Sequence, residues 1–295
     1  MSRPEVALVT GANSGLGKAL ALELARRGHA VVAGVRDLAK AEAVVGEAGG
    51  AIRAVRLDVT DSASIAAALA DIRAAEGPPD ILVNNAGVSA NSPLELLPEE
   101  HHRLVFETNY WGAVRLMQAV LPDMRQRRRG RILNVSSMMP RFVLAGSTAY
   151  AGSKAALERA SEAAAIEAAP FGVRVVVIEP GAVKSELQAN TRGGGRWADP
   201  ARTPYAPVFA RTRRIQRHML DQAMEADAFA RAALDAALAA EPPFRLLVGT
   251  DALSLVPARQ ALSDETWTAM GAVDEPAFET LLHDLGIQDS APTTS

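Results

Sequence analysis

The sequence predicts an α/β fold, a doubly wound parallel sheet of the Rossmann type with helices on both faces, in a single domain over residues 1–295. Three observations predict it. Short apolar runs alternate with helical patterns, and the runs are almost continuous in Val, Ile and Leu, as expected of strands covered on both faces. A glycine-rich turn follows the first run, where such folds bind a nucleotide.

The first predicted unit is a strand, a glycine-rich turn, a helix and a second strand. Val6–Val9 is followed at once by Thr10-Gly-Ala-Asn-Ser-Gly-Leu-Gly17, then by an amphipathic helix to Arg27 and the strand Val31–Val35. Glycines let backbone amides approach a pyrophosphate, and the helix N-terminus adds positive potential. An ordinary tight turn is the alternative, but the position between strand and helix favours a cofactor loop. The loop residues expected to contact the cofactor are Gly11, Asn13, Ser14, Gly15, Leu16 and Gly17.

The alternation continues along the chain. Further helices are expected over 38–48, 62–75, about 99–127, 150–169 and 225–240, and further strands over 51–57, 81–83, 131–135, 173–178 and 245–248. Residues 258–295 are expected to form a C-terminal extension with helices over 258–285.

Residues 186–218 are predicted to form an irregular substrate lid, because a glycine triplet at 193–195 and several prolines break any regular period. Their arginines either recognise an anionic substrate group or form a solvated charged face, and the sequence leaves both open. These arginines are Arg192, Arg196, Arg211, Arg213, Arg214 and Arg217.

Residues that can bind a ligand follow four predicted strands, each at its carboxyl end. Each one alone has a structural explanation as a helix cap, a turn residue or a strand stop. Because the carboxyl edge of an open α/β sheet is where ligands bind, their recurrence predicts one site at that edge. The residues are Asp58, Asn84, Gly87, Ser137 and the pair Pro180-Gly181.

The chemistry is expected from Tyr150-Ala-Gly-Ser-Lys154 and the upstream Ser137. Residues at i and i+4 share one face of a helix, so Lys154 is expected beside Tyr150, where its ammonium group would lower the phenol pKa. Tyr150 is then a candidate proton donor and acceptor, with Ser137 holding the substrate oxygen. The bare pattern also fits an amphipathic helix start with a solvated lysine, and the surrounding motifs decide against that.

Composition excludes several classes of protein. A net charge of −3 gives no general case for nucleic acid or an anionic membrane as partner. The chain has no cysteine, and its adjacent pair His101 and His102 suits a metal poorly, so no metal is expected. No signal peptide is recognised and no apolar run approaches the roughly 20 residues of a membrane span, so we expect a cytoplasmic protein.

In their order and spacing these motifs resemble the short-chain dehydrogenase/reductase family, over about residues 5–250. The motifs are Thr10-Gly-x-x-x-Gly-x-Gly17, Asp58, Asn84-Asn-Ala-Gly87, Asn109, Ser137, Tyr150-x-x-x-Lys154 and Pro180-Gly181, with Tyr150 placed 13 residues after Ser137 as in the family.

The resemblance implies catalytic roles for Asn109, Ser137, Tyr150 and Lys154. Tyr150 transfers the proton, Ser137 orients the substrate, Lys154 holds the nicotinamide ribose, and Asn109 positions a water linked to Lys154. It also implies cofactor contacts for Asp58, Val59, Asn84, Ala86, Gly87, Tyr150, Lys154, Pro180, Gly181, Val183 and Ser185. The run Met138-Met-Pro140 departs from the family pattern, which often has glycine there. We expect a substrate wall from Ser137, Met138, Phe142, Leu144 and Tyr150.

NADP(H) is the expected cofactor, with NAD(H) less favoured. The second strand ends at Val35, where an NAD-selective carboxylate would stand, and Arg36 can pair with a 2′-phosphate. Asp37 is the competing detail, since it either pairs with Arg36 or faces solvent. The expected partner is a small-molecule ketone, aldehyde or alcohol, in a homodimer or homotetramer. A non-catalytic NADP sensor and an epimerase or dehydratase of the same family are the alternative functions.

Overall fold

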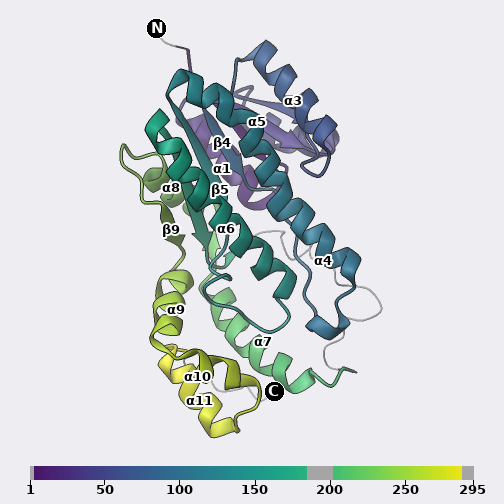
Figure 1. Ribbon diagram of the computed structural model, residues 1–295, viewed down its shortest axis with the longest axis vertical. Coiled ribbons are helices and arrows are strands. Elements are labelled where there is room, and N and C mark those ends of the chain that lie inside the picture. The colour runs from purple at the N-terminus through teal and green to yellow at the C-terminus, as the bar shows by residue number, and fades with distance from the viewer. Residues whose placement is uncertain (1–2, 185–201, 288–295) are drawn as a thin grey trace.

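Seven parallel strands form one sheet in the order β3-β2-β1-β4-β5-β6-β9 in the computed structural model, which describes residues 3–184 and 202–287 (Figure 1). The order reverses between β1 and β4, so their carboxyl ends flank the crevice where such sheets bind ligands. The predicted doubly wound single-domain fold is confirmed. The strands are β1 (Val6–Thr10), β2 (Ala30–Val35), β3 (Ile52–Arg56), β4 (Ile81–Asn84), β5 (Gly130–Val135), β6 (Val173–Pro180) and β9 (Arg245–Val248), and a separate short pair joins β7 (Val183–Lys184) to β8 (Met224–Glu225).

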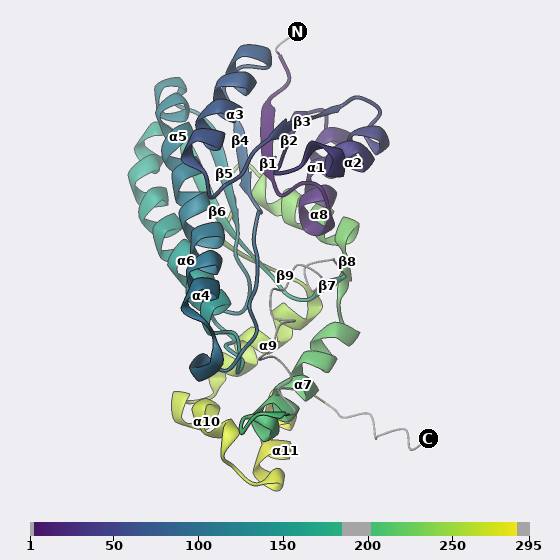
Figure 2. The same ribbon diagram turned by 90° about the vertical axis from the view of Figure 1, so that its right-hand side faces the viewer.

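Helices cover both faces of the sheet (Figure 2). Successive residues of a strand point to opposite faces, so Val9 packs with one layer of helices and Leu8 with the other. One layer holds α1 (Gly15–Arg26), α2 (Glu42–Glu47) and α8 (Ala226–Ala237), and the other holds α3 (Ser62–Ala75), α5 (Gly112–Arg127) and α6 (Thr148–Ala168). Both faces are therefore apolar, as the continuous Val, Ile and Leu runs predicted.

The long helix expected over 99–127 is present, but it changes pitch in the middle. It consists of α4 (Glu99–Phe106), a π-helical turn over Glu107–Trp111, and α5. A π turn widens the helix locally and is common at functional sites. Asn109 lies inside it and is almost fully buried.

Four helices lie beyond the carboxyl edge of the sheet (Figure 1). They are α7 (Ala206–Asp221), α9 (Thr250–Ala261), α10 (Asp264–Thr268) and α11 (Glu275–Asp284). Their apolar faces form a third core with the loop after β5, so this end of the chain encloses the edge that carries the site.

Helix α7 corrects the prediction of an irregular segment over 186–218. Residues 206–218 form a regular amphipathic helix whose buried residues Phe209, Thr212 and Ile215 recur every three positions. Pro207 misled the prediction, because proline is tolerated in the first turn of a helix. Residues 202–205 precede this helix as a short irregular stretch, and residues 186–201 of the predicted lid lie outside the described residues.

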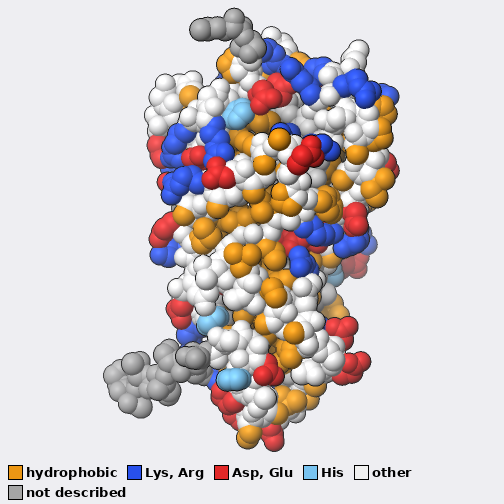
Figure 3. All heavy atoms as spheres, turned by 90° about the vertical axis from the view of Figure 1, so that its left-hand side faces the viewer, with side chains coloured by type: hydrophobic (Ala, Val, Ile, Leu, Met, Phe, Trp, Pro, Cys, Tyr) orange, Lys and Arg blue, Asp and Glu red, His pale blue; other side chains and the backbone are white. Residues whose placement is uncertain are grey.

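Short 3₁₀ turns link several elements, at Leu38–Ala41, Leu94–Leu96, Ala169–Phe171 and Ala269–Gly271. Within residues 3–184 and 202–287, no helix has the length and apolarity needed to span a bilayer. On the face shown in Figure 3, acidic and basic side chains are interspersed, in agreement with the small net charge.

Candidate active site

The ends of β1 and β4 are tied together at the crevice. The Thr10 hydroxyl oxygen accepts hydrogen bonds from the backbone N–H groups of Asn85 and Ala86, both at 3.0 Å. The Asn85 amide donates to the Thr10 carbonyl at 3.0 Å. These bonds fix the Asn84–Gly87 turn against the glycine-rich loop, so two of the predicted motifs form one rigid wall.

The glycine-rich loop opens at the N-terminus of α1 in a form that fits a phosphate group. Ser14 is extended and makes no side-chain cap, so its hydroxyl does not occupy the N–H groups of the first turn, which have no partners within the helix. Gly11 has a φ of +65°, and a Cβ on Gly17 would lie 2.2 Å from the Gly11 carbonyl oxygen. The close contact between loop and helix therefore requires glycine at position 17.

At the end of β2, Val35 is buried while Arg36 and Asp37 are exposed. The Asp37 carboxylate accepts a hydrogen bond from the Ala39 N–H at 3.1 Å and so caps the turn that follows. This contact gives Asp37 a structural role and leaves Arg36 as the charged side chain next to the strand end.

Asp58, Val59 and Asn84 all have structural contacts at this edge. Asp58 Oδ1 accepts from the Thr60 N–H at 2.9 Å, and Val59 packs under Gly112, where a Cβ would lie 2.8 Å away. Asn84 Nδ2 donates to Asn134 Oδ1 at 2.8 Å, and Asn134 Nδ2 donates to the Ser161 hydroxyl at 2.7 Å. That chain joins β4, β5 and α6. Their cofactor contacts remain predictions.

Asn109 connects the π turn to the Asn84–Gly87 loop and to α6. Its Oδ1 accepts from the Val88 N–H at 2.8 Å, and its Nδ2 donates to the Val88 carbonyl at 2.9 Å and to the Ser153 hydroxyl at 3.0 Å. Both amide hydrogens are thus used, so the Asn109 side chain links Val88 to Ser153 of α6. A Cβ on Gly87 would lie 3.3 Å from Asn109 Oδ1 and 3.7 Å from Lys154 Nζ, so these residues meet closely.

Tyr150 and Ser137 face each other, as their spacing predicted. They share a side-chain hydrogen bond that lowers the pKa of the Tyr150 phenol, but burial of the phenol is the larger effect and the pKa is raised overall. The expected lowering of the pKa by Lys154 is therefore wrong for this structure. Lys154 Nζ lies 5.8 Å from the ring centre of Tyr150 and donates instead to the Val135 carbonyl at 2.7 Å.

Lys154 is almost fully buried. Burial lowers its pKa from 10.5 to about 8, while the negative charge of Glu158 acts in the opposite direction. The ammonium form is therefore dominant at neutral pH but sensitive to its surroundings. Glu158 lies one helical turn after Lys154.

The turn after β6 is held by a residue from the C-terminal part of the chain. Asp251 Oδ2 accepts from the Ala182 N–H at 2.7 Å, and a Cβ on Gly181 would lie 1.9 Å from Asp251 Oδ1. The Pro180 carbonyl accepts from the Met138 N–H at 2.9 Å. Pro180, Gly181 and Val183 are thus fixed beside the Ser137 strand end, and Ser185 lies outside the described residues.

Met138, Phe142 and Leu144 pack away from solvent in the third core. Phe142 lies against Trp267 with ring centres 5.0 Å apart, and no more than 2% of any of the three side chains is exposed. The structure gives them a packing role beneath the C-terminal helices. A substrate contact by these residues remains a prediction.

Two arginines of α7 contact the C-terminal helix α11 and the segment that precedes it. Arg211 donates to the carbonyls of Met270 and Val273 at 2.7 and 2.6 Å. Arg214 pairs with Glu275 and Glu279, both at 2.6 Å. These contacts give Arg211 and Arg214 a structural role, and a role in binding an anionic substrate remains a prediction.

Sequence reasoning included Thr10 and Asn85 in motifs without giving them a role, and it missed Glu158 and Asp251. Glu158 could have been found from its i, i+4 spacing to Lys154. Asp251 could have been found by applying the strand-end argument to β9, since it follows that strand by three residues. Among the described residues, no group of three acidic or histidine side chains is arranged to hold a metal ion.

Comparison with known proteins gives one consistent result. The short chain dehydrogenase family pattern matches residues 5–194. Human retinol dehydrogenase 8 is 41% identical over 192 residues, which cover 63% of this chain and only 61% of that protein. Mouse 17-beta-hydroxysteroid dehydrogenase type 1 is 34% identical over 290 residues, covering 94% of this chain and 83% of that protein.

Solved structures agree. A short-chain dehydrogenase from Streptomyces avermitilis, 32% identical, superimposes with a TM-score of 0.78 over 95% of this chain and 100% of its own. A 3-ketoacyl-(acyl-carrier-protein) reductase from Brucella melitensis, complexed with NADH and 28% identical, gives 0.70 over 83% of this chain and 97% of its own.

Proposed function

Because this chain belongs to the short-chain dehydrogenase family of oxidoreductases, we propose that it interconverts a ketone or aldehyde and an alcohol by NADP(H)-dependent hydride transfer. The observation that carries the proposal is the meeting of Ser137, Tyr150 and Lys154 at the carboxyl edge of the sheet. The hydroxyl pair supports proton transfer to a substrate oxygen, and the buried lysine supplies positive charge beside it.

Each side chain has a distinct part in the proposed reaction. In reduction, Tyr150 gives its proton to the substrate oxygen while Ser137 donates a hydrogen bond that orients that oxygen. The ammonium group of Lys154 would hold the nicotinamide ribose of a bound cofactor, and Asn109 holds the loop against which Lys154 packs. When bound, the nicotinamide cofactor supplies or accepts the hydride.

The residues present fit such a cofactor. The uncapped first turn of α1 supports pyrophosphate binding, and Asp58, Val59 and the Asn84–Gly87 turn would contact the cofactor along the same edge of the sheet. Pro180, Gly181 and Val183 would hold the nicotinamide end. NADP is proposed over NAD because Arg36 is exposed at the end of β2, whereas the neighbouring Asp37 carboxylate already caps a turn. The NADH complex of the Brucella relative shows that NAD needs a direct test.

We propose a bulky apolar substrate. Two relatives are named for retinol and for hydroxysteroids, and the hydroxysteroid enzyme matches through the C-terminal helices as well. In this chain those helices enclose the site edge with a largely apolar core. The oligomeric state stays a prediction.

Cofactor choice and activity can be tested together. Purified protein should consume NADPH with at least one member of a panel of steroid, retinoid and aromatic ketones and aldehydes. Arg36→Ala removes one charge-assisted hydrogen bond of about 1.5–3 kcal/mol, so NADPH binding should weaken by roughly 10- to 100-fold. NADH binding should change far less, because NADH has no 2′-phosphate.

Equal weakening of both cofactors, or a wild-type preference for NADH, would contradict the role of Arg36. Failure of the whole panel with either cofactor would contradict the proposed activity itself.

A further inference from the structure

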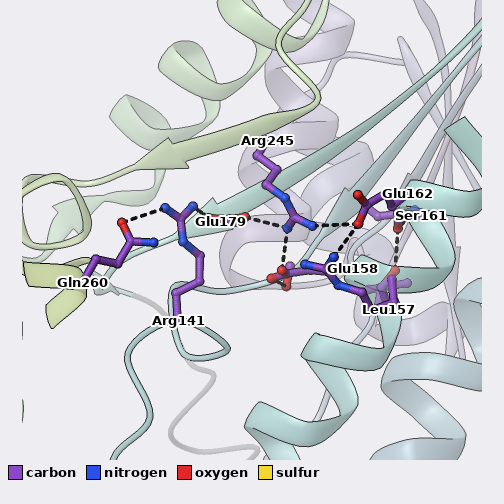
Figure 4. A network of polar contacts seen from close by, with 11 residues as sticks. Arg141, Leu157, Glu158, Ser161, Glu162, Glu179, Arg245 and Gln260 are labelled. Carbon is purple, nitrogen blue, oxygen red and sulfur yellow. Dashed lines mark hydrogen bonds and ion pairs between the residues drawn. The ribbon is translucent and has the colours of Figure 1, made fainter. Parts of the chain in front are cut away.

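A largely buried ionic network joins α6, β6 and β9 (Figure 4). Arg245 of β9 reaches between two carboxylates, at 2.6 Å from Glu158 Oε2 and 3.1 Å from Glu179 Oε1. The side chains of Glu158 and Glu179 are only 3% and 0% exposed. Arg141 pairs with the other oxygen of Glu179 at 2.8 Å, and Glu162 lies 3.5 Å from Arg245 at the outer end.

Each buried carboxylate of this network adjoins a proposed site residue. Glu158 follows Lys154 by one turn of α6, and its Oε1 accepts a hydrogen bond of 2.7 Å from Ser136, the neighbour of Ser137. Glu179 immediately precedes Pro180. The network thus lies one helical turn from the lysine, contacts the neighbour of the serine, and adjoins the turn after β6.

We propose that Glu158 is a positioning residue of this enzyme, whose carboxylate keeps Lys154 in its ammonium form while Arg245 keeps that carboxylate ionised. The consequence for catalysis rests on the proposed function, since it assumes that charged Lys154 holds the cofactor ribose beside Tyr150. The effect on the charge of Lys154 does not depend on that assumption.

The charges around the pair favour this arrangement. Lys154 faces Tyr150 and Glu158 along its own helix, and the Glu158 charge is the one that raises the pKa of this buried lysine. Glu158 in turn faces Arg245 from β9 and Glu179 from β6. The pKa of Glu158 is raised overall: burial raises it most and Glu179 adds to that, whereas Ser136 and Arg245 act in the opposite direction. The carboxylate therefore depends on its partners to stay charged.

A purely structural ion pair is the alternative. Buried pairs often contribute little net stability, so the geometry of Glu158 and Arg245 does not by itself separate the two roles. They differ in one observable property. A structural pair would leave the titration of Lys154 unchanged when Glu158 becomes glutamine, whereas a positioning carboxylate would not.

The chain is well suited to a direct titration, because it has only four lysines, Lys18, Lys40, Lys154 and Lys184. Protein labelled with carbon-13 at the lysine Cε gives separate NMR signals, and Lys154→Arg assigns the buried one. In the wild type the pKa of Lys154 is expected at about 8. Glu158→Gln should lower it by roughly one unit, as expected on removing a nearby opposite charge.

Glu162→Gln is the matched control. It lies one turn further along α6, contacts the same Arg245, and its side chain is 44% exposed, so Lys154 should titrate as in the wild type. In active protein, the alkaline limb of kcat/KM for NADPH-dependent reduction should move to lower pH by the same amount in Glu158→Gln only.

If the single variant does not fold, the double variant Glu158→Gln/Arg245→Gln replaces it in the titration, because it removes both charges of the pair. It should also show the lowered pKa of Lys154. An unchanged pKa in whichever variant folds would overturn the proposal. Since the NMR titration needs no substrate, that result is distinct from a failure of the carbonyl panel, which would overturn only the proposed activity.

Discussion

Replacing Lys154 by methionine should abolish activity yet stabilise the fold. Burial holds the pKa of Lys154 at about 8 instead of 10.5, so the native state is penalised for carrying the charged lysine. Methionine has a similar length and no charge. The change removes that penalty together with the hydrogen bond from Nζ to the Val135 carbonyl.

The size of the effect and its pH dependence follow from the shift. At about pH 7 the penalty is roughly 3 kcal/mol, and the lost hydrogen bond offsets about 1, which leaves the variant about 2 kcal/mol more stable. Between the folded and unfolded pKa values the unfolded chain binds the extra proton, so wild-type stability rises with pH. By about pH 9.5 the advantage of the variant should therefore approach zero.

The assay is urea unfolding of both proteins at each pH, with the difference in unfolding free energy as the readout. Other groups that titrate in alkali affect both proteins equally and cancel in that difference. A variant less stable than the wild type at neutral pH, with a gap that does not change with pH, would refute the argument from burial.

Two further predictions each have a control on the same kind of element. Gly17→Ala should destabilise the protein and weaken NADPH binding, since the new Cβ would lie 2.2 Å from the Gly11 carbonyl oxygen. The control is Gly46→Ala in α2, where a Cβ has no neighbour within 4 Å. Its melting temperature should be unchanged or slightly raised. Arg214→Ala should lower the melting temperature, because its contact with Glu275 is lost, and should leave KM unchanged. Arg213 is exposed on the same helix, so Arg213→Ala should alter neither quantity. A raised KM in Arg214→Ala alone would support the anionic-substrate hypothesis.

The sequence predicted the sheet and its ligand edge well, because strand ends and glycine spacing are local signals. Val6–Val9, the glycine-rich turn and Tyr150 with Lys154 lie as their spacing required. The π turn at Asn109 was not predictable from helical periodicity, because one widened turn barely alters the apolar pattern. Helix α7 was missed because Pro207 was interpreted as a break rather than as a first-turn residue.

Electrostatic details could not be predicted from spacing. The i, i+4 rule placed Lys154 on the face of Tyr150, but the direction of Nζ depends on the Val135 carbonyl, which comes from another element. The charge of Glu158 depends likewise on Arg245, 87 residues further along the chain. Distant partners of this kind decide the pKa of a buried group, and only the folded structure brings them together.

The central claim is that Tyr150 transfers the proton in a carbonyl–alcohol interconversion. The most direct measurement is the turnover of Tyr150→Phe on whichever carbonyl the wild type reduces, together with its dissociation constant for NADPH. Loss of the hydroxyl should reduce turnover by at least ~100-fold and leave NADPH binding nearly unchanged, because the ring and its packing are retained. Near-normal turnover in the purified variant would contradict the claim.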